Sequence, residues 1–162
     1  MGASTPAAIS SELHRFGLQR DRFRAALCRS AGITDTELAA AEHLEEAGPL
    51  TQRELGQRLS LTSGGITVLI DRLQRRGWVT RTSHPTDRRA VLLALTKDAR
   101  EAAPPELARY HLALAQAARA VAAEHRDAVA AFLAAATALA ENAAVELLPA
   151  TSHPLQPRHQ GS

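Results

Sequence analysis

A chain of 162 residues is long enough for one domain with an additional helical element. Only five residues are aromatic and 34 are alanine, so each side chain buries little area and a lone monomer would have a thin core. This composition favours an oligomer, and the single cysteine, Cys28, excludes an internal disulfide and a zinc site built from several cysteines.

The net charge is only +2, but the charges are unevenly distributed. Residues 51–100 contain ten Lys or Arg and four Asp or Glu, which gives +6, whereas the rest contains nine and thirteen, which gives −4. A basic middle between acidic flanks indicates a module that binds a polyanion, held by a scaffold that does not. Eighteen of the nineteen cations are arginine, although codon usage in a GC-rich genome would explain that choice equally well.

No transport signal is evident in the sequence. We expect no apolar run of the roughly 18 residues that a membrane span needs, and the N-terminal MGASTPAAIS lacks the basic and apolar regions of a signal peptide. The sequence therefore predicts a cytoplasmic protein that does not contact membranes.

Helical spacing of apolar residues begins after a short polar segment. Residues 1–8 and 149–162 have no such spacing and are expected to be disordered tails. A first helix is predicted from Ile9 to about Ala31, where Gly32 can cap it. A second helix starts at Thr34 or Asp35 and ends before Gly48-Pro49.

The next two predicted helices, 51–59 and 62–76, have the pattern of a helix-turn-helix. Such a pair needs a small residue where the helices cross and apolar residues that fuse them into one unit. Gly56 is the small residue, and the apolar positions are filled by Leu55, Leu59, Leu61, Ile66 and Leu69.

A β-hairpin is predicted directly downstream. Two β-rich runs, 78–82 and 90–95, flank the turn-forming and charged segment 83–89. A hairpin after a helix-turn-helix predicts a winged helix-turn-helix.

The remaining chain is predicted to be helical and rich in alanine. A helix starts at Thr96, is interrupted at Pro104-Pro105, and is followed by helical segments over 106–148. These segments could form an intramolecular bundle, but subunit association is favoured. The predicted fold is thus mainly α with a small β-hairpin wing: a DNA-binding domain at 34–99 and a helical dimerisation region at 9–33 and 100–148.

Helix 62–76 has one core side and one outward side. At about 100° per residue, Ile66, Leu69, Ile70 and Leu73 share the core side, while Gly64, Val68, Asp71 and Arg75 point away. A helix of this kind reads bases in the major groove, and a glycine at the outward start allows close approach to DNA; Gly65 is better explained by packing near the turn. The predicted DNA-contacting residues are Thr62, Ser63, Gly64, Thr67, Val68, Arg72 and Arg75.

The predicted wing tip carries Asp87, Arg88 and Arg89. An arginine on a narrow hairpin can enter the minor groove, and a neighbouring aspartate can orient its guanidinium. These three residues complete the predicted DNA interface.

The runs LTQRELGQRL (50–59), TSGGITVLIDRLQRRGWVTR (62–81) and DRRAVLLALT (87–96) resemble the multiple-antibiotic-resistance-regulator (MarR) family. The resemblance implies a homodimer that binds a pseudo-palindromic operator in double-stranded DNA, usually represses transcription, and often releases DNA on binding a small aromatic or anionic effector. Thr67 and Arg72 match recognition-helix positions of the family, and either Arg88 or Arg89 matches its wing arginine.

Four other interpretations are open to the sequence. Cys28 could sense peroxide, as in one branch of the family, but that branch uses tyrosines and this chain has only Tyr110. The seven histidines lack a convincing metal-binding spacing, so neither a metal nor another cofactor is expected. An enzyme would need a nucleotide-binding glycine motif that the chain lacks. A winged helix that binds protein instead of DNA is disfavoured by the basic segment.

Overall fold

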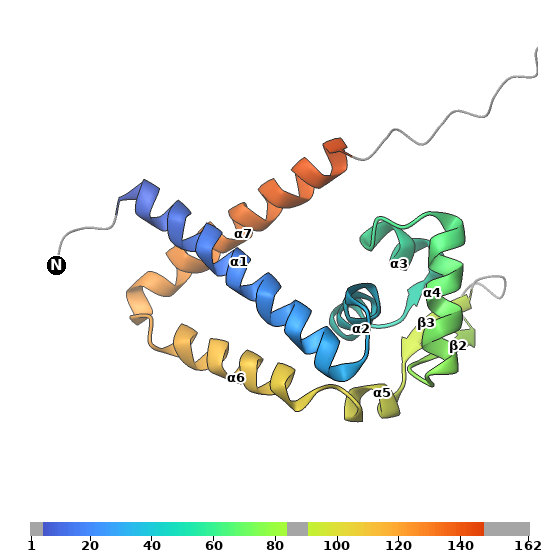
Figure 1. Ribbon diagram of the computed structural model, residues 1–162. Coiled ribbons are helices and arrows are strands. Elements are labelled where there is room, and N and C mark those ends of the chain that lie inside the picture. The colour runs from blue at the N-terminus through green and yellow to red at the C-terminus, as the bar shows by residue number, and fades with distance from the viewer. Residues whose placement is uncertain (1–4, 84–90, 148–162) are drawn as a thin grey trace, which may run out of the picture. The chain divides into compact units, whose positions relative to one another are not determined.

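The computed structural model describes residues 5–83 and 91–147, which divide into two compact units, Met1–Leu112 and Ala113–Ser162. The expected fold class is confirmed, since the described chain is mostly helical with a small antiparallel sheet (Figure 1). In chain order the elements are α1 (Pro6–Ala31), α2 (Asp35–Ala47), β1 (Leu50–Thr51), α3 (Gln52–Arg58), α4 (Ser63–Arg75), β2 (Val79–Ser83), β3 (Val91–Leu95), α5 (Lys97–Glu101), α6 (Pro105–Arg119) and α7 (Ala123–Leu147).

The first helix starts earlier than the sequence predicted. Thr5 caps it, because its hydroxyl accepts the Ala8 N–H at 3.2 Å, and Pro6 occupies the first turn, where no N–H is needed. The prediction of a disordered tail over 1–8 is therefore wrong for residues 6–8. Gly32 ends the helix with a φ of +63°, as predicted. The second predicted tail, 149–162, lies outside the described residues.

The helix-turn-helix is formed by α3 and α4. Thr51 and Thr62 cap these helices by accepting the N–H groups of Glu54 and Gly65, each at 3.2 Å. The turn between them contains Ser60, which has a φ of +52° without being glycine, and the Leu61 N–H returns to the Gly56 carbonyl at 2.9 Å. The predicted boundaries, 51–59 and 62–76, are met to within one residue.

The wing is part of a three-stranded antiparallel sheet with the order β1-β3-β2. Strands β2 and β3 form the predicted hairpin, with Val79 opposite Leu95 and Ser83 opposite Val91. The two-residue strand β1 pairs Leu50 with Leu93 and was not predicted. It attaches the chain before α3 to the wing, so the sheet and the helix-turn-helix form one structure.

One apolar core holds α2, α3, α4 and the sheet together. Its largest fully buried side chains include Leu44, Leu55, Leu69 and Leu73, with Leu93 from the central strand. Burying each such side chain contributes about 1.5–3 kcal/mol. The result is a rigid base for the outward side of α4.

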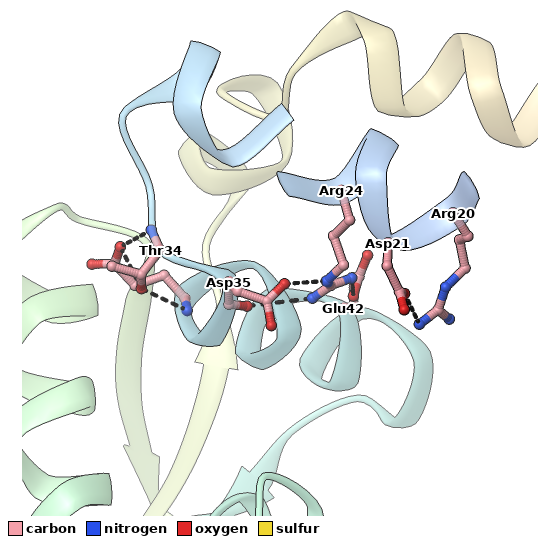
Figure 2. Close-up of polar contacts among 7 residues, drawn as sticks. Arg20, Asp21, Arg24, Thr34, Asp35 and Glu42 are labelled. Atoms are coloured by element: carbon pink, nitrogen blue, oxygen red, sulfur yellow. Dashed lines mark hydrogen bonds and ion pairs between the residues drawn. The ribbon is translucent and has the colours of Figure 1, made fainter. Parts of the chain in front are cut away.

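A second cluster joins the end of α1 to the start of α2. It contains Leu27, Cys28, Ile33 and Leu38, with Trp78 packed against it as well as against the larger core. Polar contacts reinforce this corner, which Figure 2 shows. Arg24 of α1 donates to the Asp35 carboxylate, and its Nη1 donates to Glu42 Oε2 at 2.6 Å.

Glu37 is a buried carboxylate, 1% exposed, that ties α2 to the end of α4. Its Oε2 accepts the Thr34 N–H at 2.7 Å and the Thr34 hydroxyl at 3.0 Å, and its Oε1 accepts from Arg76 Nε at 3.2 Å. Burial alone would raise the pKa of Glu37, but the bonds from Thr34 and the charges of Arg76 and Arg72 outweigh it, so the pKa lies below its ordinary 4.5.

This lowered pKa predicts a loss of stability in acid. The ionised form is favoured in the native state, so its contribution is present above about pH 4.5 and is lost as the pH falls through the lower native pKa. We expect Glu37→Gln to cost about 1–3 kcal/mol at pH 7. Urea unfolding should show the difference from wild type shrinking as the pH falls below about 4.5. A difference that is constant with pH would contradict this role.

The helices after the wing have few buried side chains. Thr96 caps α5 as predicted, and its hydroxyl donates to the Gly77 carbonyl at 2.7 Å. Helices α6 and α7 contain no buried residue. The sequence analysis expected no apolar run long enough to span a membrane. By length and composition, however, α7 is long and apolar enough to do so. One helix that qualifies by length and composition alone does not establish a membrane span.

Candidate nucleic-acid interface

Helix α4 separates an apolar side from an outward side. Ile66, Leu69, Ile70 and Leu73 are buried, as predicted, with Leu69 only 1% exposed. Val68, which the spacing places on the outward side, is 56% exposed. The core therefore fixes which side of α4 faces solvent.

The two adjacent glycines of α4 have different surroundings. A Cβ on Gly65 would lie 3.3 Å from the Thr62 hydroxyl and 3.8 Å from Leu61 Cδ2, so packing at the cap favours glycine there. A Cβ on Gly64 would meet no atom within 4 Å. Packing within the described protein thus does not explain Gly64, which leaves the outward surface at the start of the helix without a side chain.

The hydroxyl groups near the start of α4 are already partly used. Thr62 accepts the Gly65 N–H, which leaves its own proton available. Thr67 donates to the Ser63 carbonyl at 2.9 Å and accepts from Gln52 Nε2 at 2.9 Å. Sequence reasoning missed Gln52, because its position in α3 gives no sign that it reaches α4.

Exposed cations line the end of α4 and the first wing strand. Arg72 and Arg75 are exposed, and Arg75 Nε donates to the Asp71 carbonyl at 3.2 Å. Arg81 of β2 donates to Gln74 Oε1 at 3.3 Å, which joins the wing to α4. Arg76 differs from these cations, because it contacts Glu37, the Gly32 carbonyl at 3.0 Å and the Trp78 ring. It therefore has a structural role.

The wing tip predicted to contact DNA, Asp87, Arg88 and Arg89, lies outside the described residues. The base of the hairpin is described: the Thr96 N–H donates to the Trp78 carbonyl at 2.9 Å, and Val79 is buried. The two strands therefore leave the core at a fixed position, which would carry the tip.

Cys28 lies in the corner cluster and is 7% exposed. Burial raises the pKa of its thiol, and the nearby Asp35 carboxylate raises it further. Tyr110 stacks on Phe23 with ring centroids 4.6 Å apart, but no hydrogen bond joins Tyr110 to Cys28 in the part of the chain that the structure describes. A thiol with these features has little thiolate at neutral pH, which disfavours peroxide sensing.

Comparison with known proteins agrees with this architecture. Residues 31–90 match the model of the MarR family. The matched segment belongs to the MarR family. It covers α2, β1, α3, α4 and β2, which are the elements that form the outward side of α4 and the base of the wing.

Two curated proteins are similar to part of this chain. An uncharacterised HTH-type transcriptional regulator of Bacillus subtilis, YcgE, is 39% identical over 79 residues, which are 49% of this chain and 51% of that protein. The multiple antibiotic resistance protein MarR of Salmonella typhimurium is 39% identical over 66 residues, 41% and 46% of the two chains. The chain spans about half the length of the curated relatives it matches.

Solved structures share the fold of this chain over most of its length. A MepR mutant from Staphylococcus aureus has a TM-score of 0.65 at 15% identity, covering 80% of this chain and 95% of that one. A MarR family protein from Bacillus stearothermophilus has a TM-score of 0.60 at 22% identity, covering 89% and 99%. The fold predicted from the sequence is confirmed, and the resemblance to the MarR family is confirmed over residues 31–90.

Proposed function

We propose that this protein is a ligand-responsive, homodimeric repressor that binds a pseudo-palindromic operator in double-stranded DNA. The observation that carries the proposal is the outward side of α4, where a glycine without a packing role precedes exposed Thr67 and Val68. This surface belongs to the basic sequence segment 51–100. The contact residues are those predicted from the sequence, Thr62, Ser63, Gly64, Thr67, Val68, Arg72, Arg75, Asp87, Arg88 and Arg89.

Dimerisation is supported by the apolar side chains on the late helices. Leu112 of α6, and Phe132 and Leu139 of α7, are exposed within their own units. Several exposed apolar side chains on the same helices indicate an interface with another protein chain. We assign residues 9–33 and 100–148 to the interface with a second copy of the chain. A cytoplasmic location agrees with binding to chromosomal DNA. A membrane contact of α7 is the alternative that a sedimentation measurement without detergent would test.

The effector is proposed from the family resemblance to be a small aromatic or anionic compound. The buried Cys28, with its raised thiol pKa, disfavours the redox-sensing alternative. Binding to a protein in place of DNA is disfavoured by the positive charge of the middle segment.

Selection of bound duplexes from random DNA tests the proposal. We expect the full-length protein to enrich a two-fold symmetric site with half-sites about 10 bp apart. Repeating the selection with a panel of phenols and aromatic acids should identify compounds that release the enriched duplex. Failure to enrich any sequence would contradict the proposed function.

A further inference from the structure

Gln52 places its side-chain amide against the outward side of α4. Its Nε2 lies 2.9 Å from Thr67 Oγ1, although the two residues are fifteen positions apart and lie on different helices. The Thr67 hydroxyl has a single proton, which it donates to the Ser63 carbonyl at 2.9 Å. Toward Gln52 the hydroxyl is therefore an acceptor, and the amide is the donor.

These bonds change what the surface offers to DNA. Thr67 has no proton left for a phosphate or for a base acceptor. The Gln52 amide still has one N–H and its carbonyl oxygen. A donor and an acceptor on one glutamine amide match N7 and N6 of adenine in the major groove.

The bond to Thr67 also restricts the conformations of Gln52. A free glutamine side chain has many rotamers, and fixing one on binding opposes association. Here the amide is held before DNA arrives by Thr67, which precedes the exposed Val68 and lies about one turn after Gly64 in α4. Gly64 has no side chain to keep DNA away from this part of α4. An ordered amide close to it is therefore suited to reading a base edge.

We propose that Gln52 reads an A·T base pair in each half-site and that Thr67 is the positioning residue that orients its amide. This inference rests on the proposed function and revises the sequence prediction that Thr67 itself contacts a base edge or a phosphate. It assigns a specificity role to a residue of α3, outside the helix expected to carry base recognition.

Selection from randomised duplexes with full-length variants tests the inference. Gln52→Ala should lose the preference for A·T at one position of each half-site by roughly 5- to 150-fold, with the other positions unchanged. Gln52→Glu should move that preference toward a C·G pair, because a carboxylate accepts from cytosine N4 and cannot donate. Such a switch at one position cannot come from a general loss of folding.

The Thr67 variants separate positioning from direct contact. Thr67→Ser keeps both hydrogen bonds and should keep the preference, whereas Thr67→Val removes the hydroxyl and should weaken it at the same position. Adding Thr67→Val to Gln52→Ala should then cause no further loss at that position, because the two residues act as one unit.

Two outcomes would overturn the inference. Unchanged base preference in Gln52→Ala would show that the amide reads nothing, and equal weakening at every position would show a backbone contact instead. Wild-type protein that enriches no sequence would overturn the proposed function, whereas wild-type enrichment with an unaltered Gln52→Ala profile would overturn only the role of Gln52. Affinity for a scrambled duplex, measured for each variant, reports whether its fold and phosphate contacts are intact.

Discussion

Gly64→Leu is expected to abolish sequence-specific DNA binding while leaving the fold at least as stable as wild type. Apart from its chain neighbours and the nearby backbone of α4, no atom lies within 4 Å of a Cβ at this position, so the new side chain starts in open space. Replacing a helical glycine should increase stability by up to about 1 kcal/mol. The same side chain would extend from the start of α4 into the space that DNA should occupy.

The measurement pairs a thermal unfolding curve with a titration of the selected duplex. Gly64→Ala is the matched control, because a methyl group adds helical propensity but little volume, and it should weaken binding far less than leucine. Gly65→Ala gives a second comparison for stability alone, since its Cβ would lie 3.3 Å from the Thr62 hydroxyl that caps α4; its affinity is not a control, because Thr62 is itself a proposed DNA contact. A Gly64→Leu protein that still protects the same operator would show that Gly64 does not face DNA.

Arg88→Ala combined with Arg89→Ala is expected to weaken DNA binding by about 2–6 kcal/mol, if each guanidinium makes a groove or phosphate contact of about 1–3 kcal/mol. The prediction comes from the sequence, where both residues follow Asp87 at the wing tip. The two single variants should differ, because an arginine in the narrow minor groove contributes base-pair preference and a phosphate contact does not. The comparison would decide which of the two enters the groove.

A control for lost charge is available on α1 and α6, away from the proposed DNA contacts but within the ranges assigned to dimerisation, so sedimentation must first show that the control variant has the same oligomeric state as wild type. Arg15 and Arg109 are both exposed, and among the described residues each forms an ion pair within its own helix, at i, i+3 spacing. Replacing both with alanine removes the same net charge as the wing variant. If the two double variants lose equal affinity, the wing arginines act only through overall charge and the wing assignment is wrong.

Local sequence patterns were sufficient to predict most of the helices and the side of α4 that packs in the core. Threonine caps, the glycine at the end of α1 and the 3.6-residue spacing are properties of short segments, so their consequences could be predicted without a structure. The gap between α6 and α7 was harder, because Ala120–Ala122 contain neither glycine nor proline to mark it.

Features that depend on distant partners could not be predicted. Strand β1 has two residues and exists because Leu50 pairs with Leu93, far along the chain. The ion pair of Glu37 with Arg76 spans 39 positions, and the Gln52 bond to Thr67 depends on the angle at which α3 crosses α4. At the candidate site, Gly64 and the exposed side of α4 followed from periodicity, whereas the hydrogen bonds that decide what Thr67 can offer did not.

The central claim is that this surface binds double-stranded DNA with sequence preference. Its most direct test is the affinity of the full-length protein for the selected duplex and for a scrambled one, measured over a range of salt concentrations. The account predicts that affinity falls steeply with salt for both duplexes. The logarithm of the association constant should fall against the logarithm of the salt concentration with a slope of about −0.9 per phosphate contact. The selected duplex should bind about 10³-fold or more tightly than the scrambled one. Affinities that are equal for the two duplexes, or that do not change with salt, would contradict it.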